Sequence, residues 1–163
     1  MENKICIFYF LLFTCFSYGQ QHKFVPEIKA ILSQDNGEKL IKQCSRFSVE
    51  NVQSFFNVSE NEVSDLETNF KKIYTIQSTK CCLKGQKVSN LKYYGYQYVG
   101  LIIKDAKYIY INAFELETSQ ILLKSGEWQI KPVVMCDGGS SYWGVLYNIK
   151  KKKFMQLSMN GSI

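Results

Sequence analysis

The sequence predicts an α+β protein, in which N-terminal helices pack on one face of a curved antiparallel meander sheet of about five strands. Three observations carry this prediction. An apolar stripe with helical spacing follows a capping pattern near residue 60, apolar and polar side chains alternate with period two from residue 91 onward, and glycine-rich or polar turns separate the alternating segments.

The chain has 163 residues, a formal net charge of +6 and one histidine, a size that fits one ordinary domain. Residues 5–16 form a mostly apolar run that is too short to span a bilayer comfortably and ends near small residues, as in a secretory signal peptide. We expect residues 1–19 to be this leader and residues 20–163 to form a single α+β domain. An uncleaved anchor is an alternative, and lipidation at Cys15 is a less favoured one. The mature protein is expected to be exported, periplasmic or secreted, with no membrane span.

The cysteines that follow the leader would enter an oxidising compartment. They are Cys44, Cys81, Cys82 and Cys136. A bond between the neighbours Cys81 and Cys82 would close a strained ring and force Cys44 onto Cys136. We therefore expect Cys136 to pair with Cys81 or Cys82, with Cys82–Cys136 as the candidate disulfide. A metal site is not expected, because zinc ligands are usually two or more residues apart and the sole histidine, His22, lies near the terminus.

Helical patterns come first in the mature chain. Residues 26–44 carry spaced apolar side chains around an Asp-Asn-Gly break and predict two short helices or one broken helix. Ser59 and Glu62 then form a capping-box pattern. The apolar residues that follow share one face of a helix of about four turns, and they are Val63, Leu66, Phe70 and Ile73. We interpret this stripe as core packing.

Two strands are expected within residues 91–114, with a polar turn at 104–107. In the second strand Ile109, Ile111 and Ala113 point one way, and Tyr108, Tyr110, Asn112 and Phe114 point the other. One face of the sheet is therefore aliphatic and suited to the capped helix, and the other is rich in tyrosine. This second face is either a binding surface with Tyr94, Tyr96 and Tyr110, or a surface covered by loops or the N-terminal segment, since strand propensity also enriches tyrosine.

The segment 128–161 is expected to form two hairpins, whereas residues 115–127 fit either a strand or a short helix. An Asp-Gly or Gly-Gly pair within residues 137–139 supplies the positive φ angles of a tight turn between two strands. Four lysines at 150–153 interrupt the pattern before a last strand, and lysines at such a tip are usually only solvated. Asp137 is most simply a turn residue that accepts backbone hydrogen bonds.

Several blocks of this region form a combined pattern. They are Gln97-Tyr98-x-Gly100, Tyr110-Ile111-Asn112-Ala113-Phe114, Cys136-Asp137-Gly138-Gly139-x-x-Tyr142-Trp143-Gly144-Val145, Phe154 and Asn160-Gly161. Over residues 59–163 the pattern resembles a group of small exported proteins of uncharacterised function from Bacteroidota. This resemblance implies export and no particular activity. The order of helices followed by a meander is also similar to cystatin-like and NTF2-like folds, but fold analogy says little about function.

Several common chemistries are disfavoured by the residues present. Hydrolases of the Ser-His-Asp or Cys-His kind need a histidine base, for which His22 is the only candidate. Phosphate-binding loops need a helix after their glycines, where a strand is expected here. The lysines cluster at one hairpin tip instead of interleaving with aromatic residues, so nucleic-acid binding is not expected. No cofactor or metal is expected either.

We therefore expect an exported binding protein without enzymatic activity, of inhibitor, immunity or envelope-accessory type. The candidate contact residues are Asp137, Gly138, Gly139, Ser140, Ser141, Tyr142, Trp143, Tyr94, Tyr96 and Tyr110, although Trp143 fits a core position equally well. The positive net charge favours an anionic partner, either an envelope component or a protein. One alternative is a carboxylate-dependent glycan or peptide hydrolase centred on Asp137 with Asp105, Glu115 or Glu117. Another is a structural exported module without a ligand.

Overall fold

The computed structural model describes residues 23–80 and 82–162, so the expected leader lies outside the described residues. The helices and strands are β1 (Lys29–Ile31), α1 (Gly37–Ile41), β2 (Val52–Phe56), α2 (Glu60–Asn69), β3 (Tyr94–Ile103), β4 (Ala106–Glu115), α3 (Gln120–Ser125), β5 (Tyr142–Asn148) and β6 (Lys153–Met159). Short 3-10 turns add Gln34–Asn36, Phe70–Thr75, Leu91–Tyr93, Glu127–Gln129 and Gly139–Ser141. Within the described ranges, no helix is long and apolar enough to cross a membrane.

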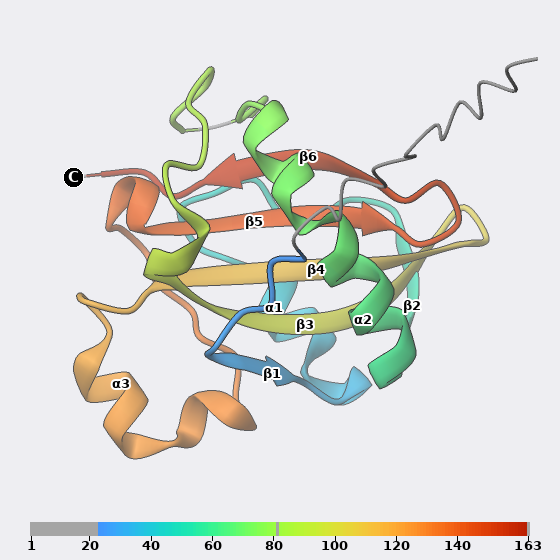
Figure 1. Ribbon diagram of the computed structural model, residues 1–163, viewed down its shortest axis with the longest axis horizontal. Coiled ribbons are helices and arrows are strands. Elements are labelled where there is room, and N and C mark those ends of the chain that lie inside the picture. Colours follow the sequence, from blue (N-terminus) through green and yellow to red (C-terminus); the bar gives the residue numbers. More distant parts are fainter. Residues whose placement is uncertain (1–22, 81, 163) are drawn as a thin grey trace, which may run out of the picture.

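The strands form one six-stranded sheet in the order β1-β3-β4-β5-β6, with β2 paired to the same side of β3 as β1. Strands β3 to β6 form an antiparallel meander, as the sequence predicts (Figure 1). The sheet is mixed, however, because β1 runs parallel to β3. At three residues, β1 is too short to show an alternating pattern, which is why the sequence indicated a purely antiparallel sheet.

One face of the sheet is covered by α2 and the Phe70–Thr75 turn (Figure 1). The predicted capping box is present: the Ser59 hydroxyl accepts a hydrogen bond from the Glu62 N–H at 3.3 Å, and the Glu62 carboxylate accepts one from the Ser59 N–H at 2.9 Å. The predicted apolar stripe packs on the aliphatic face that contains Ile109 and Ile111. The regular helix ends at Asn69, and the last two residues of the stripe come from the 3-10 turn.

The tyrosines do not share one face of the sheet. Across the sheet, Tyr96 pairs with Ala113 and Ala113 with Trp143, so this row lies on the helix-covered face. Tyr110 pairs with Val99 and Leu146 on the opposite face. The predicted single tyrosine-rich face is therefore wrong, because the register places the tyrosines of β3 beside the aliphatic residues of β4.

The second face is covered as well, by two irregular layers. The first contains α1 and packs Leu40 and Ile41 on Tyr110 and Leu146. The second contains α3 and residues 127–135, and it packs on Phe114 and Tyr142. Helices therefore cover both faces of the sheet, not one face as expected from the sequence.

A disulfide joins Cys44 to Cys136 across 92 residues of the chain. The expected Cys82–Cys136 bond is wrong, because the α1 layer crosses the second face and brings residue 44 beside residue 136. Cys82 is itself disulfide-bonded, and its sulfur lies 3.1 Å from the carbonyl oxygen of Ser45. The disulfide thus ties the covering layer to the loop that precedes β5.

Candidate functional site

The most exposed part of the candidate site is the loop of residues 137–141. Asp137, Gly138 and Ser140 are exposed, whereas Gly139 is buried. Gly138 and Gly139 have φ values of +88° and +55°, so the glycine pair supplies the left-handed backbone of the turn. The loop does not close a hairpin, however: among residues 128–138 only a 3-10 turn is regular, because this segment packs on the second face of the sheet and does not pair within it.

Four other parts of the chain hold this loop in place. The Asn160 amide donates to the carbonyl oxygens of Met135 and Asp137 at 2.7 and 3.0 Å. The Gly139 N–H donates to the Gly161 carbonyl at 3.0 Å. Tyr94 Oη donates to the Ser140 carbonyl at 3.1 Å, and Ser141 Oγ donates to the Glu115 carboxylate at 2.8 Å. Just before the loop, Cys136 is bonded to Cys44. The loop is therefore exposed in its side chains and fixed in its backbone.

The aromatic candidates lie beneath the loop, in the core. All five side chains are at most 6% exposed: Tyr94, Tyr96, Tyr110, Tyr142 and Trp143. They are therefore covered by other parts of the chain and do not form a binding surface. Burial raises the pKa values of Tyr94, Tyr96 and Tyr110 above their usual range. Tyr94 supports the loop from within through the hydrogen bond of its hydroxyl group to Ser140, whereas the Tyr142 hydroxyl pairs with Ser119.

A buried polar network under the second covering layer positions the segment before the loop. Gln97 Nε2 donates to the carbonyls of Trp128 and Lys131 at 2.6 and 2.7 Å, and Gln97 Oε1 accepts from the Val133 N–H at 2.8 Å. Asn112 donates to the same Gln97 oxygen at 3.1 Å. The sequence interpretation missed this role, although two amides at inward positions of otherwise apolar strands are a signal for such a network.

Arg46 completes this network from the α1 layer. It is 5% exposed, its Nη2 donates to Asn112 Oδ1, and its guanidinium carbon lies 5.9 Å from the ring centre of Tyr110. Burial lowers the pKa of Arg46, and Tyr110 opposes this shift. Gly144 makes room for this arrangement, since a Cβ there would lie 2.2 Å from the Tyr110 hydroxyl oxygen. No ion pair to Arg46 occurs among the described residues. The contacts that Arg46 makes with the network are packing against Tyr110 and the hydrogen bond to Asn112.

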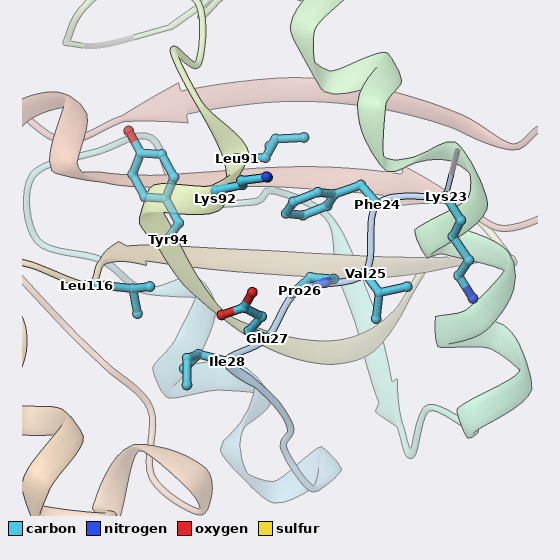
Figure 2. A pocket seen from close by; sticks show the side chains of 10 residues that line it. All are labelled: Lys23, Phe24, Val25, Pro26, Glu27, Ile28, Leu91, Lys92, Tyr94 and Leu116. Atoms are coloured by element: carbon cyan, nitrogen blue, oxygen red, sulfur yellow. The ribbon is translucent and has the colours of Figure 1, made fainter. Parts of the chain in front are cut away.

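A small pocket lies on the other side of Tyr94, between residues 23–28 and the Leu91–Tyr93 turn (Figure 2). Its volume is about 220 Å³, and Phe24, Leu91 and Leu116 supply apolar walls. This volume is below the about 300–1,000 Å³ that is usual for small-molecule sites. The pocket therefore indicates no ligand class of its own, and Tyr94 lines it as well as supporting the loop.

Two stretches of the chain without acidic residues come near each other at the loop. Neither residues 68–104 nor residues 138–162 contain an aspartate or a glutamate. Leu83, in the lysine-containing loop of residues 77–87, lies near Gly139: a Cβ added there would be 3.8 Å from the Leu83 side chain, at ordinary van der Waals distance. The sequence interpretation placed the lysines at one hairpin tip only, because it could not show that these two acid-free stretches are neighbours.

Among residues 23–80 and 82–162, no group of three or more His, Cys, Asp or Glu side chains is placed to hold a metal ion. Two of the candidate hydrolase carboxylates have different hydrogen-bond partners. Glu115 accepts from Ser141, and Asp105 accepts from the Gln53 amide at 3.2 Å. The chain matches no protein-family model, and comparison with curated proteins and with solved structures returns no significant match.

Proposed function

We propose that this protein is an exported binding protein without enzymatic activity, and that it contacts an anionic partner through the loop of residues 137–141. One observation carries the proposal: the loop backbone is held by several distant segments, while the outward side chains of Asp137 and Ser140 make no hydrogen bond within the described residues. A loop ordered before binding loses little conformational entropy when a partner docks.

The export part of the proposal is supported by the leader pattern and by the disulfide. Disulfides form and persist in oxidising compartments, and the Cys44–Cys136 bond stabilises the segment beside the loop. The resemblance to small exported proteins of Bacteroidota belongs to the same proposal, as does a relation to cystatin-like or NTF2-like folds. A comparison with those folds would test whether they also contain a strand that runs parallel to its neighbour, as β1 does here.

A crosslinking capture experiment tests the binding function. Residues 20–163 would be incubated with an envelope extract of the source organism, beside the variant Asp137→Ala/Ser140→Glu, which places a bulky carboxylate at an outward position of the loop without changing the net charge. The matched control is Asp35→Ala/Gln129→Glu, which makes the same changes of charge at exposed positions elsewhere. We expect one partner to be retained by the parent protein and by the control, and to be lost by the loop variant. Equal retention by all three proteins, or no specific retention at all, would overturn the proposal.

The hydrolase alternative is separated from binding by one substitution. Asp137→Asn keeps the size of the side chain and its ability to accept hydrogen bonds, but it removes the carboxylate that acid–base chemistry needs. Under the binding proposal, Asp137→Asn retains the partner within about threefold of the parent affinity. Turnover of a glycan or peptide that disappears in Asp137→Asn would instead establish the hydrolase.

A further inference from the structure

A second surface of the protein carries the features of a binding site. It is a hollow of about 400 Å³ between the Phe70–Thr75 turn, the loop of residues 77–87 and the edge strand β6. Its polar lining consists of Thr75, Gln77, Thr79, Lys87 and Gln156. The amides of Gln77 and Gln156 make no hydrogen bond to other described residues, and both are exposed, so their donors and acceptors face solvent.

The backbone around the hollow is fixed. The Thr79 N–H donates to the Leu157 carbonyl at 3.2 Å, and this bond attaches the loop to β6. Within the loop, the Ser78 N–H donates to Gln86 and the Gly85 N–H donates to Ser78, both at 2.8 Å. The walls of the hollow therefore keep their spacing without a ligand.

Gln156 sits in an unusual backbone conformation at this edge. Its φ is +55°, and the pairing of β5 with β6 shifts register at this point, so Gln156 occupies a β-bulge. A left-handed conformation at a residue other than glycine costs about 1–3 kcal/mol and is often found at functional sites. The bulge turns the Gln156 amide into the hollow and interrupts the regular edge of the sheet.

Lysines flank the hollow at both ends. The loop of residues 77–87 supplies Lys80, Lys84 and Lys87, the β5–β6 turn supplies Lys150 and Lys151, and the start of β6 supplies Lys153. Among the described residues none of these six side chains forms an ion pair, whereas Lys152 is paired with Asp65. Along β6, Lys153 lies four residues before Leu157, where the loop of residues 77–87 is attached, a span of about 13 Å at the usual rise of a strand. The charge is therefore distributed along a line.

The chemistry of this line favours one class of partner. Every exposed cation along this line is a lysine, which acts as a point charge. Arginine, by contrast, binds a single phosphate through two parallel hydrogen bonds. A membrane surface would need protruding apolar side chains beside the cations. Among residues 23–80 and 82–162, the exposed large apolar side chains other than Tyr74 lie away from this edge, at Val25, Tyr93, Ile121, Ile130 and Val134. Regularly spaced carboxylates or sulfates on a polar backbone fit better.

We propose that this hollow binds an acidic sugar unit of a linear anionic polysaccharide, and that the flanking lysines hold the neighbouring units. Amide and hydroxyl groups of the hollow pair with the sugar hydroxyls, and Lys87 pairs with the acidic group. This inference takes the negative charge of the partner from the proposed function and rests on it in that respect. The surface it uses is separate from residues 137–141.

Binding of size-defined heparin and alginate oligosaccharides tests the inference, with neutral dextran as the uncharged comparison. Lys84→Gln/Lys87→Gln/Gln156→Ala should weaken binding about tenfold. The control Lys39→Gln/Lys124→Gln/Gln129→Ala removes the same charge and one amide at exposed positions in and next to α1 and α3, and it should change the affinity less than about twofold. Binding should also weaken as the salt concentration rises.

Three results would overturn the inference: no binding of either acidic oligosaccharide, equal losses in the two variants, or tighter binding to phosphatidylglycerol vesicles than to the oligosaccharides. The loop variant Asp137→Ala/Ser140→Glu, which leaves the net charge unchanged, separates this inference from the proposed function. It should lose the captured partner and keep the heparin affinity. If the hollow variant keeps its heparin affinity while the loop variant loses its partner, the proposed function stands and the polysaccharide site is refuted.

Discussion

Replacing Trp143 by alanine tests whether this residue belongs to the core or to a contact surface. The Trp143 side chain is fully buried in β5, and its ring lies edge-on to Tyr94 and Tyr96 with ring centres 5.4 and 5.9 Å away. An aromatic side chain of this kind buries about 150–250 Å², which corresponds to about 4–6 kcal/mol at about 25 cal/mol per Å². Core Trp→Ala substitutions cost about 3–5 kcal/mol, and we expect a loss of this size in the free energy of unfolding.

Urea unfolding followed by circular dichroism measures this loss. Trp143→Phe is the matched variant, because it keeps a ring against Tyr94 and Tyr96 and should lose only about 1–2 kcal/mol. A loss below about 1 kcal/mol for Trp143→Ala, with an unchanged near-ultraviolet spectrum, would refute the core assignment. If the alanine variant does not fold, the size of the Trp143→Phe effect decides, since an exposed contact residue would show almost none.

Three further predictions concern stability. Cys44→Ser/Cys136→Ser opens a crosslink that spans 92 residues and should lower the free energy of unfolding by about 4–5 kcal/mol in urea titrations, and an unchanged midpoint would contradict the pairing. Ser59→Ala removes the cap of α2 and should cost about 1 kcal/mol, with Ser59→Thr as the conservative comparison. The Lys152 ammonium, 2.6 Å from the carboxylate, lowers the pKa of Asp65 below 3.8, so stability from this pair is present above that pH and is lost as the pH falls through the folded-state pKa. In urea titrations at several pH values, Asp65→Asn should be less stable than the parent near neutrality and should converge with it in acid.

The two proposed surfaces are adjacent, which bears on how a partner would engage the protein. Leu83 belongs to the same loop as Lys80, Lys84 and Lys87, and its side chain lies near the turn at Gly139. The loop of residues 137–141 and the lysine line therefore meet at one end of the sheet (Figure 1). A partner bound at one surface would therefore lie close to the other, and the loop and hollow variants distinguish which of the two it uses.

The helix and the meander could be predicted because their signals are local. The Ser59 cap, the helical spacing after it, and the alternation in β3 to β6 each depend on residues near one another in sequence. The glycine pair at 138–139 is also a local signal, and both glycines have the predicted positive φ.

The strand before that turn was wrongly predicted because apolar character alone does not distinguish a strand from a segment that covers a sheet. Val133 and Met135 are apolar because they pack on the second face. Their backbone groups are satisfied by side chains, including the amide of Asn160, and not by a neighbouring strand. Nothing in the local pattern of residues 128–136 carries that information.

The sequence by itself determined the α+β class, the capped helix, the order of the antiparallel strands and the positive charge. The tertiary structure decided the Cys44–Cys136 pairing, the division of the tyrosines between two covered faces, and the meeting of two acid-free stretches along β6. The physical reason is that caps, turns and periodicity act within a few residues. Register, layer order and charge clustering instead depend on which distant segments bury their apolar surface together.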